Sequence, residues 1–222
     1  MNLTFGLLIF PNVQLLDVAG PNDAFAGVPG AKVHLIWKSR DSIKTTSGME
    51  IRPDTTFENC PNLDVLCVPG GGGVNPLLQD GEVLAFVRKQ AASAKYITSV
   101  CTGSLVLGMA GILKGKRATC HWNAVDFLPA MGAIPIKDRV VKDGNIYTAG
   151  GITSGIDFGL EILADLLGEE EAKTIQLAME YAPAPPFSCG TPEEAPEDIV
   201  AEARRRMEHS RQERLKLFGE AA

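Results

Sequence analysis

Cys101 is the residue whose type and position most directly suggest chemistry. It is a lone thiol in the segment YITSVCTGSLVLGMAGIL, residues 96–113. The β-branched run predicts a buried strand over 96–100, and the small and aliphatic residues predict a buried helix over 102–113. The free amides of the first helical turn and the helix dipole then favour the thiolate, so we expect a lowered pKa and a nucleophilic role. The alternative is a small buried hydrophobic residue that only fills the core.

The turn at Cys101 is similar to a nucleophile elbow, in which a sharp, strained turn holds the nucleophile at the carboxyl edge of a sheet. Small residues must flank such a turn, and Gly103 and Ser104 supply them on one side. Val100 and Thr102 make the match to the G-x-S-x-G pattern incomplete.

A glycine run, PGGGG at Pro69–Gly73, follows another apolar run at 63–68. Glycines let backbone amides approach a substrate closely. The amides of Gly71 and Gly72, together with that of Thr102, are therefore candidate donors to negative charge that develops on a substrate. The alternatives are a plain loop or a phosphate-binding loop, although the Lys-Ser/Thr ending of a P-loop is missing.

Asp17 is the second candidate catalytic residue. Its carboxylate lies among apolar residues in QLLDVAGPNDAF, where burial is costly without hydrogen bonds. We place it in the loop after the first strand, near the same sheet edge. The alternative is a turn aspartate that accepts backbone hydrogen bonds.

The order of elements that must position these residues predicts an α/β fold. Apolar runs predict strands over 3–10, 33–37, 63–68 and 96–100, and 137–148 reads as a β-hairpin turning at Asp143-Gly144. Helices are expected to begin at Pro21 and to cover 76–94, 102–113, 152–167 and 169–181. Such alternation predicts a mostly parallel sheet with helices on both faces.

The chain divides near residue 181. Residues 1–181 are expected to form the α/β domain, 182–196 a proline-rich tether, and 197–218 a polar helix of mixed charge. We expect the segment 182–222 to be part of the same unit or a contact with a second chain, because the helix is too polar to pack fully on its own domain. A loosely docked surface helix is the alternative.

Composition excludes several classes of protein. A net charge of −6 and a pI near 5.2 argue against nucleic-acid binding. There is no secretory signal at the amino terminus and no apolar run near the roughly 20 residues of a membrane span, so we expect a cytoplasmic protein without membrane contact. The five cysteines, Cys60, Cys67, Cys101, Cys120 and Cys189, follow no zinc or disulfide spacing, and we expect free thiols and no metal.

Four segments carry a resemblance that covers nearly the whole chain. GLLIFPNVQLLDVAGPNDAF, VPGGGG, SVCTGSLVLGMAGILKGKRATCHW and AGGITSGIDFGLEIL are similar to the superfamily of PfpI-type peptidases and class I glutamine-amidotransferase-like proteins. Within it, aspartate at position 17, threonine after the cysteine and EYAPAPPF at 180–187 resemble the isonitrile (isocyanide) hydratases. The resemblance implies a flavodoxin-like, class I amidotransferase-like fold with a nucleophile elbow at Cys101.

The same resemblance implies a lyase that hydrates a small isocyanide to an N-substituted formamide through a covalent thioimidate on Cys101. Asp17 would transfer protons, the amide of Thr102 would stabilise charge or orient water, and Gly71, Gly72, Gly150 and His121 would contact the substrate. No metal or organic cofactor is required. Members of the superfamily are usually homodimers or larger, so a homodimer is expected.

Three alternatives stay open. The first is a non-enzymatic redox sensor, in which oxidation of Cys101 is the function. The chain is another thiol enzyme of the superfamily if it acts on glyoxals, as a glyoxalase or deglycase, or on peptide bonds. The peptidases need a histidine, often directly after the cysteine; here that residue is Thr102, so a Cys-His pair has to use His121, which we interpret first as a pocket or packing residue.

Overall fold

The predicted apolar runs form the central strands of one sheet in the computed structural model, which describes residues 2–218. The residues of the innermost strands are almost all buried, as expected for strands covered on both faces. The seven strands lie in the order β10-β11-β7-β6-β1-β2-β5, and only β10 runs antiparallel to its neighbour. Their bounds are β1 Thr4–Leu8, β2 Lys32–Trp37, β5 Thr55–Thr56, β6 Val65–Val68, β7 Tyr96–Val100, β10 Val140–Asp143 and β11 Ile146–Ala149.

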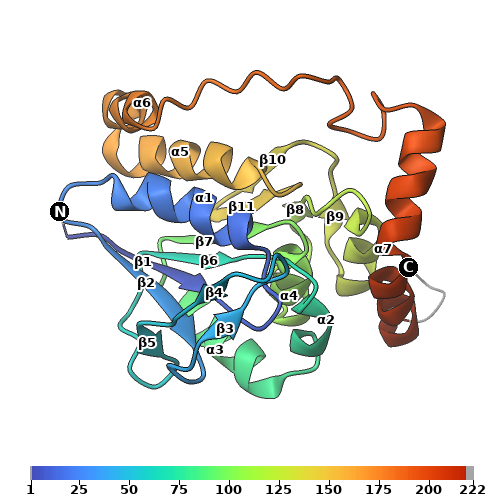
Figure 1. The fold of residues 1–222 in the computed structure, drawn as a ribbon. Coiled ribbons are helices and arrows are strands. Elements are labelled where there is room, and N and C mark those ends of the chain that lie inside the picture. Colours follow the sequence, from blue (N-terminus) through green and yellow to red (C-terminus); the bar gives the residue numbers. More distant parts are fainter. Residues whose placement is uncertain (1, 219–222) are drawn as a thin grey trace.

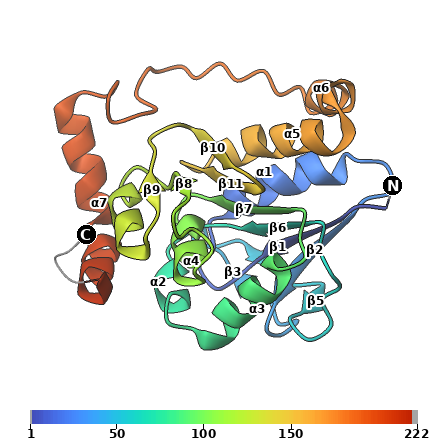
Figure 2. The same ribbon diagram turned by 180° about the vertical axis from the view of Figure 1, so that it is seen from behind.

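Helices cover both faces of this sheet (Figures 1 and 2). On one face lie α1 (Leu15–Ala26) and α5 (Ser154–Leu167), with α6 (Glu169–Ala178) packed outside α5. The other face carries α2 (Val74–Leu77), α3 (Gly81–Ala91) and α4 (Gly103–Met109). The predicted fold class, a mostly parallel α/β sheet flanked by helices, is confirmed. The remaining short elements are β3 Ile43–Lys44, β4 Glu50–Ile51, β8 Arg117–Ala118, β9 Ile134–Pro135 and the 3₁₀ helix η1 Val125–Met131.

The strand order brings three loops together at one edge of the sheet. β6 lies between β1 and β7, and all three are parallel, so their carboxyl ends meet. The chain crosses from one side of β1 to the other between β2 and β6, which is the kind of switch point where α/β folds bind ligands. Here the Gln14 amide donates to the Gly70 carbonyl at 2.9 Å and the Gly73 amide to the Asn12 carbonyl at 3.1 Å.

The start of the first helix was predicted wrongly. α1 begins at Leu15, not at Pro21, and Pro21 lies buried inside it. The proline removes the hydrogen bond that its own amide would have made. Burial of Val18, Ala24 and Phe25 along the same helix outweighs this loss. As a result Asp17 lies in the first turn of α1, and not in the loop that the sequence predicted.

The other helices of the domain are shorter than predicted. α5 begins at Ser154 and not at residue 152, and α6 ends at Ala178 and not at residue 181. The expected helix over 76–94 is split into α2 and α3, because Asp80 caps α3 by accepting the amides of Glu82 at 3.1 Å and Val83 at 3.2 Å. The helix after the elbow ends at Met109, and Gly111 then takes a left-handed backbone conformation with φ +81°. The predicted hairpin is present as β10 and β11.

The tether and the terminal helix have the bounds that the sequence predicts. Residues 182–196 contain no helix or strand, and they cross the molecule from α6 to α7 (Glu197–Phe218), which stands at the opposite end (Figure 1). α7 packs beside α2 through polar groups, with Arg214 buried against Asn75. Among the described residues, no helix is long and apolar enough to cross a bilayer.

Candidate active site

Cys101 sits at the strand-to-helix turn in a strained backbone conformation. Its φ is +56°, a left-handed value that residues other than glycine rarely adopt, and its amide donates to the Ala149 carbonyl of β11 at 3.0 Å. The turn is tight against the neighbouring strand, because a Cβ added at Gly103 would lie 1.9 Å from the Val68 carbonyl oxygen. The geometry is that of the predicted elbow.

Asp17 lies beside the Cys101 thiol although the two residues are far apart in sequence. Its side chain is completely buried, and Oδ2 accepts the Gly70 amide at 2.9 Å. Among the described residues, Oδ1 has no hydrogen-bond partner. Burial raises the pKa of Asp17 to about 7, with the Gly70 amide and the Cys101 side chain acting in the opposite direction. A carboxyl group with that pKa can both give and take a proton near neutral pH.

The lowered pKa expected at Cys101 is not found. Cys101 is 6% exposed, and burial raises the pKa of its thiol well above 9, reinforced by the negative charge of Asp17 and by Cys120 when that thiol is ionised. The amide and hydroxyl of Thr102 lower the pKa, but they do not overcome burial. Cys101 and Asp17 therefore form a coupled pair that holds at least one proton at neutral pH, and the proton resides on the sulfur in the resting site.

Thr102 and the glycine run hold this pair in place. The Thr102 hydroxyl accepts the Gly71 amide at 3.2 Å, which leaves its own proton directed to another acceptor, the Cys101 sulfur. The Gly71 amide is thus already used, and it is not the free donor to substrate that the sequence predicted. Gly70, which the sequence did not single out within the run, instead supplies the amide that binds Asp17.

Gly70 and Gly72, two other glycines of the run, have different surroundings. A Cβ added at Gly70 would lie 2.6 Å from the Thr102 amide nitrogen, so the loop can approach the elbow only with glycine at this position. Gly72 is exposed, and the atom nearest to an added Cβ is Thr46 Cγ2 at 3.4 Å. Gly72 therefore lies against the loop after β3 and not against the elbow.

His121 is bound to the elbow through its backbone. Its amide donates to the Cys101 carbonyl at 3.3 Å, and its Nδ1 accepts the Asn123 amide at 3.2 Å. Burial, helped by the positive charge of Arg214, lowers the pKa of His121 to about 4. The imidazole is therefore neutral at physiological pH with its proton on Nε2. It forms a wall of the adjoining cavity, as the pocket interpretation predicted.

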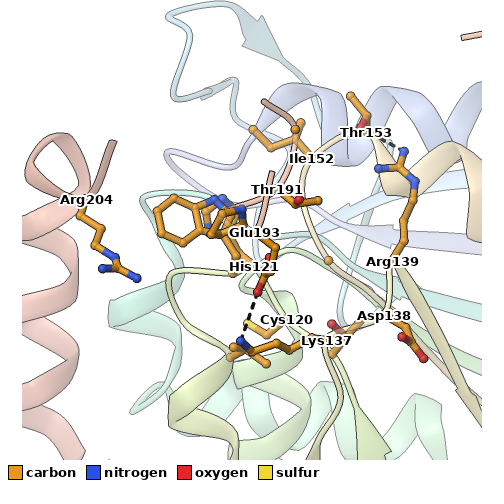
Figure 3. A pocket seen from close by; sticks show the side chains of 17 residues that line it. Cys120, His121, Lys137, Asp138, Arg139, Ile152, Thr153, Thr191, Glu193 and Arg204 are labelled. Carbon is orange, nitrogen blue, oxygen red and sulfur yellow. Dashed lines mark hydrogen bonds and ion pairs between the residues drawn. The ribbon is translucent and has the colours of Figure 1, made fainter. Parts of the chain in front are cut away.

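A cavity of about 430 Å³ opens next to the elbow (Figure 3). His121 and Gly150 line it, and both are joined to Cys101, since Gly150 follows the Ala149 carbonyl that binds the Cys101 amide. Cys101 and Asp17 themselves are not among the lining residues described. The other walls come from loops, from η1, from α7 and from the tether, whose Glu193 pairs with Lys137 at 3.2 Å. These residues are Thr119, Cys120, Trp122, Val125, Lys137, Asp138, Arg139, Gly151, Ile152, Thr153, Gly190, Thr191, Pro192, Glu193 and Arg204.

The site holds no arrangement suited to a metal ion. Within residues 2–218, no three His, Cys, Asp or Glu side chains are grouped closely enough to bind one. The five cysteines are free thiols, and Cys120, which lines the cavity, and Cys101 at the elbow are both buried. The chemistry that this geometry can perform is nucleophilic attack by a buried thiol with proton transfer through a neighbouring carboxyl group.

Comparisons with known proteins agree with this geometry. The sequence model of the DJ-1/PfpI family matches residues 5–165. An isonitrile hydratase from Pseudomonas putida is 54% identical over 222 residues, covering all of this chain and 97% of that protein. This full-length match to an enzyme confirms the predicted resemblance and the prediction that the chain is an enzyme.

Solved structures give the same result for the fold. A THiJ/PfpI family protein from Pseudomonas syringae superposes with a TM-score of 0.95 at 40% identity, covering 99% of this chain and 91% of the other. Drosophila melanogaster DJ-1beta shares the fold at 24% identity and a TM-score of 0.72, covering 82% of this chain and all of the other. From the family match and the full-length relative, the chain belongs to the DJ-1/PfpI family.

Proposed function

We propose that the protein hydrates an isocyanide to an N-substituted formamide, with Cys101 as nucleophile and Asp17 as the group that carries protons. The observation that carries the proposal is the buried Asp17 carboxyl beside the thiol at a strained elbow. The full-length similarity to an isonitrile hydratase supplies the substrate class.

In the first step the thiol adds to the terminal carbon of the isocyanide. Asp17 takes the thiol proton as the carbon–sulfur bond forms, and then gives that proton to the same carbon, which leaves a neutral thioimidate, R–N=CH–S–Cys101. The addition uses one thiol and one isocyanide and leaves Asp17 ionised. Burial, which raises the pKa of Asp17 to about 7, suits it to both transfers.

In the second step Asp17 removes a proton from water while the water oxygen attacks the thioimidate carbon. The proton passes to the nitrogen, and a tetrahedral adduct forms with nitrogen, oxygen and sulfur on one carbon. The carbon–sulfur bond then breaks, the hydroxyl proton returns through Asp17 to the sulfur, and R–NH–CHO leaves. The hydroxyl and amide of Thr102 stabilise the departing thiolate.

The cavity beside the elbow is the site that we propose for the R group. Gly150 and His121 border Cys101 there, and the Trp122 and Val125 side chains add apolar surface. Gly71 acts indirectly in this scheme, through Thr102, and Gly72, which lies against Thr46, has no part in it. None of these steps uses a metal or an organic cofactor.

Two alternatives fit the geometry less well. A redox sensor works through an exposed thiol of low pKa, whereas Cys101 is buried and burial raises its pKa. A peptidase needs a histidine to activate its thiol, whereas His121 is neutral and its Nδ1 is occupied by the Asn123 amide.

A homodimer is part of the proposal. Of the seven large apolar side chains exposed on the described surface, Leu177 of α6 at 81% and Phe187 of the tether at 77% are the most exposed, and such residues favour association. Light scattering of the full chain and of its Leu177→Glu and Phe187→Glu variants tests this. A monomeric wild type, or two variants that dimerise unchanged, would contradict this assignment of the interface.

The test of the function is incubation with para-nitrophenyl isocyanide, followed by absorbance and by mass analysis of the product. The wild type and Cys189→Ala, which removes an exposed thiol of the tether, should form the N-substituted formamide. Cys101→Ala should form none. Product from Cys101→Ala would refute the nucleophile, and absence of product from the wild type across aryl and alkyl isocyanides would refute the reaction.

A further inference from the structure

Arg214 carries a buried positive charge into the region of the site. It is 5% exposed and is the one fully buried residue of α7 as described. Its Nε donates to Asn75 Oδ1 at 2.8 Å and its Nη2 to Ser210 Oγ at 2.9 Å. No carboxylate of the described residues lies at ion-pair distance, although an isolated buried charge is costly. A negative charge elsewhere in the site would offset the free-energy cost of burying the Arg214 guanidinium.

Arg214 is connected to the loop that holds Asp17. Asn75 lies in α2, directly after the glycine run, and is itself buried. Its Oδ1 accepts Arg214, and its Nδ2 donates to the Ser210 carbonyl at 3.1 Å and to Glu213 Oε2 at 2.7 Å. Every polar atom of the Asn75 side chain therefore contacts α7, so the terminal helix fixes the end of this loop.

The same helix also holds the loop on the other side of the elbow. Arg211 Nη1 donates to the Asn123 carbonyl at 3.0 Å. The Asn123 amide donates to His121 Nδ1, and the His121 amide to the Cys101 carbonyl. α7 is thus bonded to both loops that enclose the nucleophile.

The charge of Arg214 acts on the thiols and the imidazole near the elbow. The groups that act on Arg214 are Cys120 and Cys101, if ionised, together with Arg211 and Glu213. The groups that act on Cys101 are Asp17, Cys120 and Thr102. Burial raises the pKa of the Cys120 thiol to about 12, and the charge of Arg214 opposes this rise; the same charge helps burial to lower the pKa of His121, so it reaches residues that border the elbow. The negative charges that act on Arg214 are therefore that of Glu213 and, when a thiol is ionised, that of Cys101 or Cys120.

We propose that Arg214 is a positioning residue of the active site, which balances the negative charge that forms on Cys101 and, through Asn75, fixes the loop that binds Asp17. The inference rests on the proposed role of Cys101 as nucleophile. It also makes the terminal segment part of the same functional unit as residues 1–181, since α7 supplies this charge.

The test is the pH dependence of carboxamidomethylation of Cys101 by iodoacetamide, in which the sulfur displaces iodide, read by peptide mass spectrometry on the full chain. Arg214→Met should react about tenfold more slowly at a given pH, because loss of the charge raises the pH at which the thiolate forms by about one unit. Arg214→Lys keeps the charge and should remain within about threefold of the wild type. Arg206→Gln, which removes an exposed charge paired with Glu202 on the same helix, should match the wild type.

A second uncharged variant serves as the control for a folding defect. Exchange of an unpaired buried charge for an apolar side chain of similar size often maintains stability, and Arg214→Gln offers an amide donor to Asn75 if the methionine variant does not fold. Overlap of the Met and Gln profiles with that of Arg206→Gln would overturn the proposal, even if their melting temperatures fall. Isocyanide turnover is assayed separately, so a shifted alkylation profile without wild-type turnover would refute only the proposed reaction.

Discussion

Cys67 and Cys101 occur on neighbouring parallel strands of one sheet, and both thiols are buried. Cys67 lies within β6, paired in register with Thr98 of β7, and has an ordinary extended backbone. Cys101 lies one residue beyond the end of β7, at φ +56°. Burial raises the pKa of Cys67 to about 12 and that of Cys101 well above 9.

What separates the two thiols is therefore not a lower resting pKa but their position relative to a proton acceptor. The carboxyl edge of the sheet brings the first turn of α1 to Cys101, with Oδ1 of Asp17 free of other partners among the described residues. Cys67, in contrast, lies within β6, which pairs with β1 on one side and with β7 on the other. A buried thiol in this fold becomes a nucleophile when a carboxyl group beside it can take its proton.

Asp17→Asn tests this distinction most severely. An amide cannot accept the thiol proton, so turnover of para-nitrophenyl isocyanide should fall by about 10²–10⁴-fold, the range for loss of a general acid–base group. The wild-type rate should also fall as pH drops below about 7, where Asp17 becomes protonated, and the variant should lack this dependence. The measurement is the pH profile of kcat/KM.

The control for this variant is Asp64→Asn, whose carboxyl accepts the Thr4 amide and pairs with Lys95 at the opposite end of the sheet. It should retain the wild-type profile. A rate for Asp17→Asn within about threefold of the wild type would remove the proposed difference between Cys101 and Cys67.

The same carboxyl should reduce stability at neutral pH. Burial raises its pKa from 3.8 in the unfolded chain to about 7 in the folded one, so between these values the unfolded chain alone is ionised. Stability is therefore lost as pH rises from about 4 to about 7, and a shift of about three units corresponds to about 4 kcal/mol. Asp17→Asn should gain up to that amount relative to the wild type at about pH 8.

Urea unfolding of both proteins measures this gain. Near pH 4 the two should differ by less than about 1 kcal/mol, because the wild-type carboxyl is then protonated in the folded state and only about half ionised in the unfolded state. Equal stabilities of the two proteins at about pH 8 would show that Asp17 is not held in a costly buried state.

The loop after β6, which follows Cys67, provides a prediction of intermediate size. A Cβ at Gly70 would lie 2.6 Å from the Thr102 amide nitrogen and 2.7 Å from its hydroxyl oxygen. Gly70→Ala should therefore displace the elbow and lower turnover by about 10- to 100-fold. Gly72→Ala, with its nearest contact at 3.4 Å, should stay within about twofold. Similar rates for the two variants would show that the close approach of the loop is unimportant.

The sequence predicts the sheet and the elbow because both depend on local signals. Continuous apolar runs mark strands buried on two faces, and a cysteine followed by small residues marks a sharp turn into a helix. The start of α1 was missed because Pro21 is typical of a first helical turn, whereas packing of residues on both sides of it extends the helix to Leu15. Local signals of this kind are overruled when tertiary burial is large.

The electrostatics of the site depend on long-range contacts that the sequence does not contain. The amides near Cys101 favour a thiolate, but burial and the charge of Asp17 outweigh them, and neither can be counted before the strand order is known. The engagement of Gly71 with Thr102 depends on the same packing. Likewise, nothing in the sequence distinguishes Arg214 from the other arginines of α7, although it alone among them is buried.

Cys67→Ala gives the smallest expected effect and completes the comparison from the side of the inert thiol. The side chain is fully buried in β6, so its loss leaves a small cavity and should lower the free energy of unfolding by about 1–2 kcal/mol. Turnover should stay within about twofold of the wild type, because the Asp17 carboxyl and the Thr102 hydroxyl keep their partners at the neighbouring strand end. Urea unfolding and the isocyanide assay measure the two quantities separately. A loss of turnover much larger than the loss of stability would mean that the Cys67 thiol takes part in proton transfer with Asp17. The position of a cysteine, inside a strand or at a strand end, would then no longer explain which cysteine reacts.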